Sequence, residues 1–212
     1  MPRIRISYRE EEHWNTGTHM FGTILGLVGA VVLGIQVRGE NTLIQAAVWA
    51  YSLSLILLFG ASTAYHAVAL PRYKKRLRIL DHICIYYLIA GTYTPMALIV
   101  LAESKGWLLF GLVWGMAAFG TVLKLFFTGR FELFSVLLYL LMGWLIVIDL
   151  DFLLTTLSHQ AQLFLMAGGG FYTVGILFYA IRKIPFNHMI WHLFVLCGAA
   201  CHWVMVWLVL RG

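Results

Sequence analysis

Two histidines near the end of the chain, His188 and His192, have the spacing of a metal half-site. Residues four apart lie on the same face of a helix, so both imidazoles would point the same way. Paired imidazoles at this spacing recur in zinc sites. Because H-x-x-x-H also occurs in helices that bind no metal, the pair becomes a site only if other ligands meet it.

Other polar residues at the ends of apolar segments could complete the site. His66 closes the segment ASTAYH and would supply a third imidazole, while Ser62 lies one helical turn before it. Asp81 stands near the start of the next apolar segment. Zinc with three protein ligands and an open fourth position is the catalytic arrangement, whereas structural zinc sites are closed by four ligands. We therefore expect Zn²⁺ at His66, His188 and His192, with Asp81 and Ser62 as catalytic residues.

The chemistry expected of such a site is hydrolysis. Zinc lowers the pKa of a bound water to about 7, which provides a nucleophile at neutral pH. Asp81 could orient this water, accept its proton or hold a ligating histidine from behind, and Ser62 could hydrogen-bond a substrate. Both residues also have ordinary interpretations. An aspartate is favoured at any helix N-terminus, and a serine packs well between membrane helices.

The composition places these residues in a membrane protein. Of the 212 residues, 61% are hydrophobic and 11% are charged, whereas a soluble domain carries about 25% charged residues. Seven apolar runs have about the length needed to cross the hydrocarbon core as helices, and they are too continuous for a transmembrane β-barrel. We predict an all-α integral membrane protein with a single seven-helix transmembrane domain over residues 1–212. The expected spans are 20–37, 44–64, 79–101, 107–127, 134–150, 161–181 and 188–210.

The basic residues predict the orientation of the helices. Twelve of the fifteen lysines and arginines fall at the amino terminus, in the even-numbered connections or, for Lys124, in the last turn before one of them. Short loops rich in Lys and Arg stay in the cytoplasm, so the N-terminus is predicted to be cytoplasmic and the C-terminus outside. Charges divided among short connections beside the membrane give no support to nucleic-acid binding. The twelve are Arg3, Arg5, Arg9, Arg72, Lys74, Lys75, Arg76, Arg78, Lys124, Arg130, Arg182 and Lys183.

This topology brings the candidate residues to one depth. The second span ends on the cytoplasmic side with His66, the third begins there with Asp81, and the seventh begins there with His188 and His192. His202 lies ten residues beyond His192, about 15 Å along a helix. That distance is too great for the same metal, so His202 is expected to make an interhelical hydrogen bond.

The remaining polar residues near this end leave alternatives open. Glu12, Asn15 and His19 share one face if the first helix begins early. They form either a polar cluster below the site or an ordinary interfacial turn. His82 is expected to face lipid headgroups, and Asn187 is expected to be the N-cap of the last helix.

The motifs also carry a resemblance. ASTAYH, LDH and HMIWH match, in order, the S-x-x-x-H, aspartate and H-x-x-x-H of the hemolysin III branch of the progestin and adipoQ receptor superfamily, which includes the adiponectin receptors. EEHWNTGTH, IAGTYTP and IPFNHMIWHLFVLCGAACH are similar to bacterial hemolysin III proteins, so the resemblance covers essentially the whole chain. It implies a seven-helix bundle in the bacterial cytoplasmic (inner) membrane. It also implies zinc held by the three histidines, with Ser62 and Asp81 around its water.

The resemblance implies more than one function. Ceramidase-like amide hydrolysis has been proposed for the receptor branch, so the leading expectation is a zinc-dependent hydrolase of a membrane-lipid amide or ester. The alternative is a non-catalytic protein of membrane homeostasis, or a sensor of the bilayer, with structural zinc. The name hemolysin III points to cytolysis. A pore-former, however, needs a polar lumen or a soluble-to-inserted transition, and the sequence indicates neither.

Overall fold

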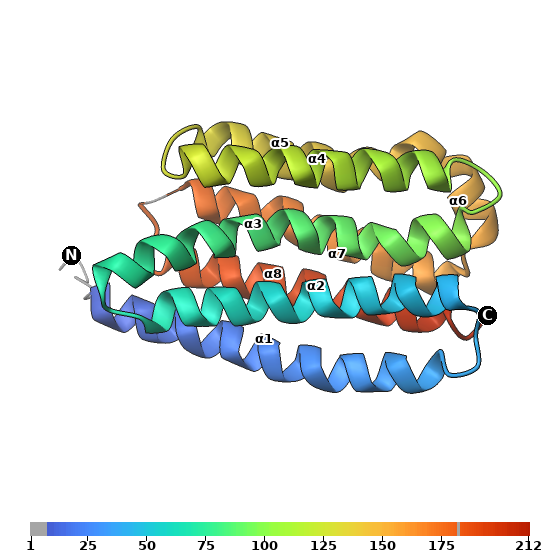
Figure 1. Cartoon of the computed structure of the whole chain (residues 1–212), viewed down its shortest axis with the longest axis horizontal. Helices are drawn as coiled ribbons and strands as arrows, with labels where there is room; N and C mark the ends of the chain where they lie inside the picture. Colours follow the sequence, from blue (N-terminus) through green and yellow to red (C-terminus); the bar gives the residue numbers. More distant parts are fainter. Residues whose placement is uncertain (1–7, 182) are drawn as a thin grey trace.

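The computed structural model describes residues 8–181 and 183–212, and no strand occurs in that part of the chain. Within it, seven helices are long and apolar enough to cross a membrane, which confirms the predicted all-α membrane fold. The helices run side by side in one bundle, and α1 begins at the end of the bundle opposite to the end of α8 (Figure 1). The assignment of one end to the cytoplasm stays a prediction from the loop charges, of which Arg3, Arg5 and Arg182 lie outside the described residues.

The helices follow one another through short connections. The fifth span, Glu132–Thr156, is built from three consecutive helical pieces, and the third span ends in a π-helical turn after Pro95. The bounds are α1 Tyr8–Gln36, α2 Thr42–Ala67, α3 Pro71–Pro95, η1 Met96–Val100, α4 Gly106–Phe127, α5 Glu132–Trp144, η2 Leu145–Asp149, α6 Leu150–Thr156, α7 His159–Ala180 and α8 Asn187–Val209.

Two helices begin well before the apolar runs that predicted them. α1 is already helical through REEEHWN, before residue 20, and α3 is helical through PRYKKRLR, before residue 79. A helix satisfies its backbone hydrogen bonds whatever its side chains are, so it can continue past the hydrocarbon where hydropathy falls. Pro71 fits the first turn of α3 because that position needs no backbone donor. These polar turns supply part of the candidate site.

The start of α8 differs from the predicted cap. Asn187 is the first helical residue, and Phe186 before it adopts a left-handed backbone with φ 56°. The Asn187 side chain instead donates a hydrogen bond from Nδ2 to the carbonyl oxygen of Phe178, at 3.1 Å. The N-cap prediction was therefore wrong, because the amide is used between helices. This bond ties the first turn of α8, which carries His188, to α7.

An ionic cluster joins α3, α4 and α5 at the same end of the bundle. The Lys124 side chain is 1% exposed, and its Nζ lies 2.8 Å from Oε2 of Glu132. Arg78 donates from Nη2 to Oε1 of Glu132 at 3.3 Å. His82 Nδ1 lies 3.8 Å from the same carboxylate, and Tyr139 donates its hydroxyl proton to the His82 carbonyl at 3.0 Å. The expectation that His82 faces lipid headgroups was wrong, because its side chain lies inside the bundle beside the Glu132 carboxylate.

We expect Glu132→Gln to lower the free energy of unfolding by up to about 3–5 kcal/mol, because it leaves the buried Lys124 ammonium without its carboxylate. Adding Lys124→Met should restore most of the loss, since an apolar side chain needs no partner. Unfolding in detergent micelles with increasing SDS measures both variants. Wild-type stability in the single variant would contradict this account of the cluster.

Candidate metal centre

Three histidines from two helices meet at one end of the bundle. His66 comes from the last turn of α2, and His188 and His192 come from the first two turns of α8. One ring nitrogen from each lies within 4.8 Å of the other two. The ring centroid of His66 is 5.2 Å from that of His188 and 4.9 Å from that of His192. Three imidazoles from two helices thus surround one point.

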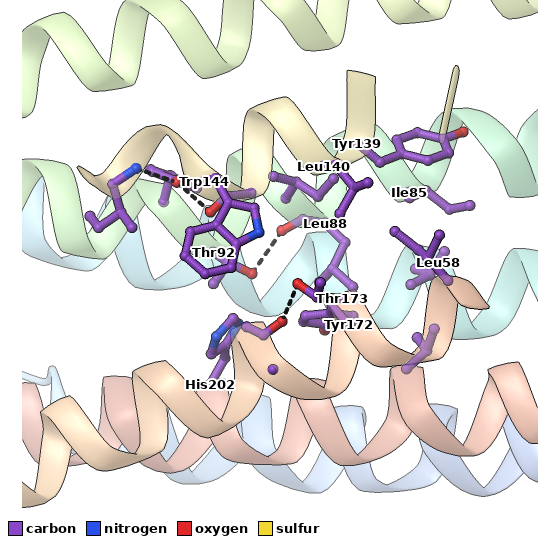
Figure 2. A pocket seen from close by; sticks show the side chains of 18 of the residues that line it. Leu58, Ile85, Leu88, Thr92, Tyr139, Leu140, Trp144, Tyr172, Thr173 and His202 are labelled. Carbon is purple, nitrogen blue, oxygen red and sulfur yellow. Dashed lines mark hydrogen bonds between the residues drawn. The ribbon is translucent and has the colours of Figure 1, made fainter. Parts of the chain in front are cut away.

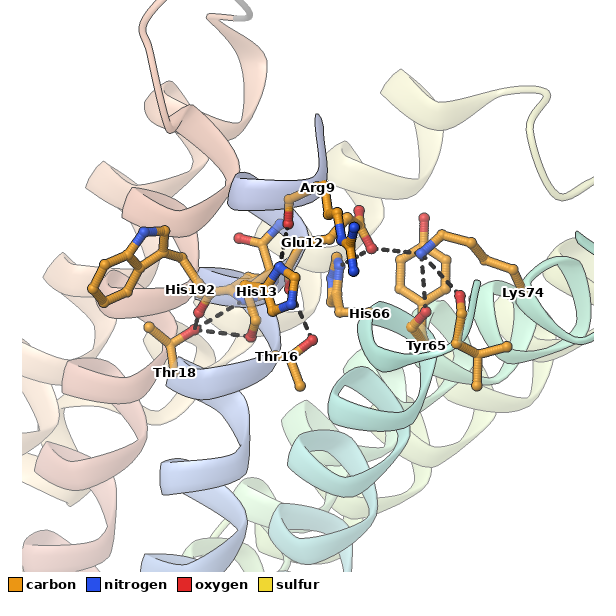
Figure 3. A network of polar contacts seen from close by, with 12 residues as sticks. Arg9, Glu12, His13, Thr16, Thr18, Tyr65, His66, Lys74 and His192 are labelled. Atoms are coloured by element: carbon orange, nitrogen blue, oxygen red, sulfur yellow. Dashed lines mark hydrogen bonds and ion pairs between the residues drawn. The ribbon is translucent and has the colours of Figure 1, made fainter. Parts of the chain in front are cut away.

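Hydrogen bonding determines which nitrogen of His66 is free. Its Nδ1 lies 3.3 Å from Oε2 of Glu12, and the same carboxylate pairs with the ammonium of Lys74 (Figure 3). An ionised carboxylate only accepts hydrogen bonds, so Nδ1 carries the proton and Nε2 has a lone pair. That Nε2 is buried and has no hydrogen-bond partner among the residues described. An imidazole held from behind by a carboxylate, with its other nitrogen bare, is typical of a metal ligand.

His192 is held in a similar way by α1. Its Nδ1 lies 3.4 Å from Oγ1 of Thr18. The Thr18 hydroxyl donates to the backbone carbonyls of Trp14 and Asn15, each at 3.0 Å, so its oxygen accepts from Nδ1 of His192. Figure 3 shows Thr18 and Glu12 approaching the two histidines from the same stretch of chain. This arrangement leaves Nε2 of His192 as the nitrogen available to a ligand.

The donor set fits zinc. Neutral imidazoles with free lone pairs are ligands that Zn²⁺ accepts, and three protein ligands leave one tetrahedral position open. Two of the histidines are buried and the third is partly buried, which restricts competition from water. Among the described residues, these three form the group of His, Cys, Asp and Glu close enough to share one ion.

The two predicted catalytic residues face the same cavity as His188 and His192. Asp81, from α3, and Ser62, from α2, are both buried and both line it. Oγ of Ser62 is buried next to the Asp81 side chain, so this hydroxyl can donate to the carboxylate or to a bound molecule. The structure thus brings both residues to the cavity beside the histidines.

The first helix contributes more than its sequence indicated. His19 stacks on His192 with ring centroids 3.6 Å apart and planes 15° from parallel, and both of its nitrogens are buried without a partner in the described residues. Glu12 and His19 each contact a histidine of the centre, so the polar-cluster interpretation of this face is correct. The signal was the helical spacing of Glu12, Asn15 and His19. Spacing alone could not show that α1 packs against both α2 and α8.

A cavity of about 440 Å³ leads away from the histidines along the inside of the bundle. Its walls are mostly apolar and come from α2, the third and fifth spans, α7 and α8, together with His19 of α1, as Figure 2 shows for part of the lining. Trp144 of α5 and Met166 of α7 line it and are also 53% and 70% exposed. The cavity therefore reaches the apolar outer surface between the fifth span and α7. A lipid could enter there without crossing water.

We expect Glu12→Gln to weaken zinc binding about 10–100-fold, because the amide lacks the negative charge that supports Nδ1 of His66. Competition with a chelator of known affinity measures the change on purified protein. Glu40→Gln is the matched control, because Glu40 is exposed at the opposite end of α1. Equal zinc affinity in wild type and Glu12→Gln would show that Glu12 does not support the metal centre.

Together, the fold and the site define a class: a seven-helix membrane protein with a three-histidine candidate metal centre beside an internal cavity. The chain belongs to the Haemolysin-III related family, whose model matches residues 7–203. It is 42% identical to Hemolysin-3 of Bacillus cereus over 192 residues, which cover 90% of this chain and 88% of the relative. The Hemolysin-3 homolog of Bacillus subtilis is 41% identical over 192 residues, 90% of each chain.

A more distant relative places the family in a wider group. The human Monocyte to macrophage differentiation factor is 30% identical over 206 residues, which cover 91% of this chain and 82% of that protein. This match supports the adiponectin receptor-like superfamily that the sequence motifs indicated.

Proposed function

We propose that this protein is a zinc-dependent hydrolase that cleaves an amide or ester bond of a membrane lipid. Its 212 residues would form one domain in the bacterial cytoplasmic membrane, with the N-terminus inside. One observation carries the proposal: the bare Nε2 of His66 stands with two more imidazoles at the end of a largely apolar cavity that reaches the outer surface of the bundle. Such a site can receive a lipid and hydrolyse it.

Each residue has a defined part in this reaction. His66, His188 and His192 would hold zinc, which would supply Lewis acidity and a nucleophilic water near neutral pH. Glu12 and Thr18 hold the rings of His66 and His192 from behind, so the ligands need little reorientation. Asp81 accepts a proton as water attacks the carbonyl carbon, and it returns that proton to the departing nitrogen or oxygen. Ser62 donates a hydrogen bond to the substrate from its buried hydroxyl.

The cavity supports a lipid as the class of substrate. Its apolar walls favour a hydrocarbon chain, because each buried methylene contributes about 0.8 kcal/mol. Entry between the fifth span and α7 lets the chain pass directly from the bilayer. The polar group to be cleaved would then reach the histidines at the end of the cavity.

A non-catalytic role is the second candidate. The three imidazoles come from α2 and α8, so a bound metal would also tie these two helices together. A membrane-homeostasis protein or bilayer sensor with structural zinc needs only this link between α2 and α8. Cytolysis is not proposed, because the cavity in the described residues is mostly apolar and offers no polar lumen.

Hydrolysis in liposomes tests the proposal. Purified protein is reconstituted with ceramides and with phospholipid esters, and the released fatty acid is measured by mass spectrometry. We expect release that stops when a chelator removes zinc and returns when zinc is added. If zinc-loaded, folded protein releases no fatty acid from ceramides or phospholipid esters, the proposed hydrolase activity is contradicted and a structural role of zinc is favoured.

A further inference from the structure

The cavity has a second polar region, far from the histidine centre. His202 of α8 lies there, with Nε2 3.3 Å from the carbonyl oxygen of Leu165 in α7, which confirms its predicted interhelical hydrogen bond. A carbonyl oxygen only accepts, so Nε2 carries the proton and Nδ1 of the neutral ring is a bare acceptor. Nδ1 is buried and has no partner within the described residues.

A phenol hydroxyl lies on the same wall. Tyr172 of α7 lines the cavity beside His202, and the two ring centroids are 5.5 Å apart. Its hydroxyl is also buried without a partner in the described chain. Figure 2 shows both side chains on the wall formed by α7 and α8, facing Thr92 and Trp144. A donor and an acceptor thus lie unused side by side.

Glycines on the facing helices hold these rings in place. A Cβ at Gly168 would collide with the ring of His202, and a Cβ at Gly198 would lie 3.0 Å from the ring of Tyr172. Each ring is therefore wedged against the backbone of the neighbouring helix. Rings held this way cannot easily turn to find another partner, and a buried polar atom left unpaired costs free energy. Because both residues line the cavity, a molecule bound there can supply the missing partners.

We propose that His202 and Tyr172 form a subsite for a hydroxyl group carried on the lipid chain. One hydroxyl can donate to Nδ1 of His202 and accept from the Tyr172 hydroxyl, so it satisfies both atoms. A carbonyl or ether oxygen could only accept, and a saturated chain could do neither. A carboxylate is disfavoured at this subsite, because no lysine or arginine among the described residues lines the cavity there to balance its charge.

The position of this subsite specifies the ligand further. His202 lies ten residues after His192 in α8, about 15 Å along the helix axis. Leu58 and Tyr139 lie toward one end of the view in Figure 2, and Trp144 and His202 lie toward the other. The favoured ligand is therefore a long-chain lipid with a hydroxyl well removed from its headgroup. This inference rests on the proposed function only in taking a lipid chain as the occupant of the cavity.

Binding measurements test the subsite without hydrolysis. Saturated fatty acids of one length, each with a hydroxyl at a different position, compete with a fluorescent fatty acid for purified protein, both zinc-loaded and after chelation. We expect the fatty acid with its hydroxyl at one particular position to bind about tenfold tighter than the unsubstituted fatty acid. Tyr172→Phe, which removes a single oxygen, should abolish most of that preference and leave binding of the unsubstituted chain unchanged. His202→Gln should act in the same direction.

Tyr86→Phe is the matched control, since Tyr86 is fully buried and does not line the cavity. Its preference for the hydroxylated chain should equal that of wild type. Equal binding of all chains, as when a water molecule fills the subsite, would overturn the inference. A preference for the hydroxylated chain that persists in Tyr172→Phe would overturn the inference as well. If the protein prefers the hydroxylated chain but hydrolyses no lipid, the proposed enzymatic activity is contradicted and the subsite is not.

Discussion

Replacing His192 with alanine is expected to remove the bound zinc and reduce lipid hydrolysis to the background rate. His192 is buried at the centre, with its ring against His19 and within reach of His66 and His188. Two remaining imidazoles make a weak, incomplete site, since catalytic zinc is held by three protein ligands. Zinc per chain and fatty-acid release are measured on the same preparation.

The control for this variant is His159→Ala. His159 is exposed at the start of α7, at the opposite end of the bundle, so its loss should change neither quantity. Helix content and elution volume verify that His192→Ala remains folded. If folded His192→Ala keeps both zinc and activity, the histidine cluster is not the catalytic centre.

Asp81→Asn is expected to lower the turnover rate by about 10²–10⁴-fold, the usual contribution of a general acid–base group. Asparagine has nearly the same shape as aspartate but cannot take the proton of the attacking water. Zinc content and stability should stay near wild type, because Asp81 is not among the three clustered ligands. The measurement is the initial rate of fatty-acid release at saturating lipid, with exposed Asp151→Asn as control.

This variant also separates the two proposed functions. If zinc is only a structural tie between α2 and α8, Asp81→Asn keeps the cellular phenotype, while loss of a histidine unfolds the bundle. If the protein is an enzyme, folded Asp81→Asn loses the phenotype together with the activity. An Asp81→Asn protein with full turnover would contradict the role given to this carboxylate.

The spans were predictable because membrane helices must bury long apolar runs, a constraint that the sequence displays directly. Their polar starts were not, since the helical turns REEEHWN and PRYKKRLR carry no hydropathy signal. Asn187 illustrates the same limit. It looked like a cap from its neighbours in sequence, but the carbonyl of Phe178 comes within reach only when α7 and α8 pack.

The candidate site was likewise predictable from the sequence only in part. His188 and His192 could be paired from their spacing, and His66 could be added because loop charges and chain direction bring it to the same end. The carboxylate behind His66 and the ring stacked on His192 come from α1, and no pattern within α1 indicates which helices it contacts. The cavity arises from side chains of six of the seven spans, so it too requires the folded structure.

The most direct test of the account is elemental analysis of the wild-type protein. The protein is purified in mild detergent without chelators, incubated with zinc, and freed of loosely bound metal before measurement. We predict one tightly held zinc ion per chain, since three imidazoles, two of them buried, surround one point. Folded protein that retains no zinc after this treatment would show that the three histidines do not form a zinc site.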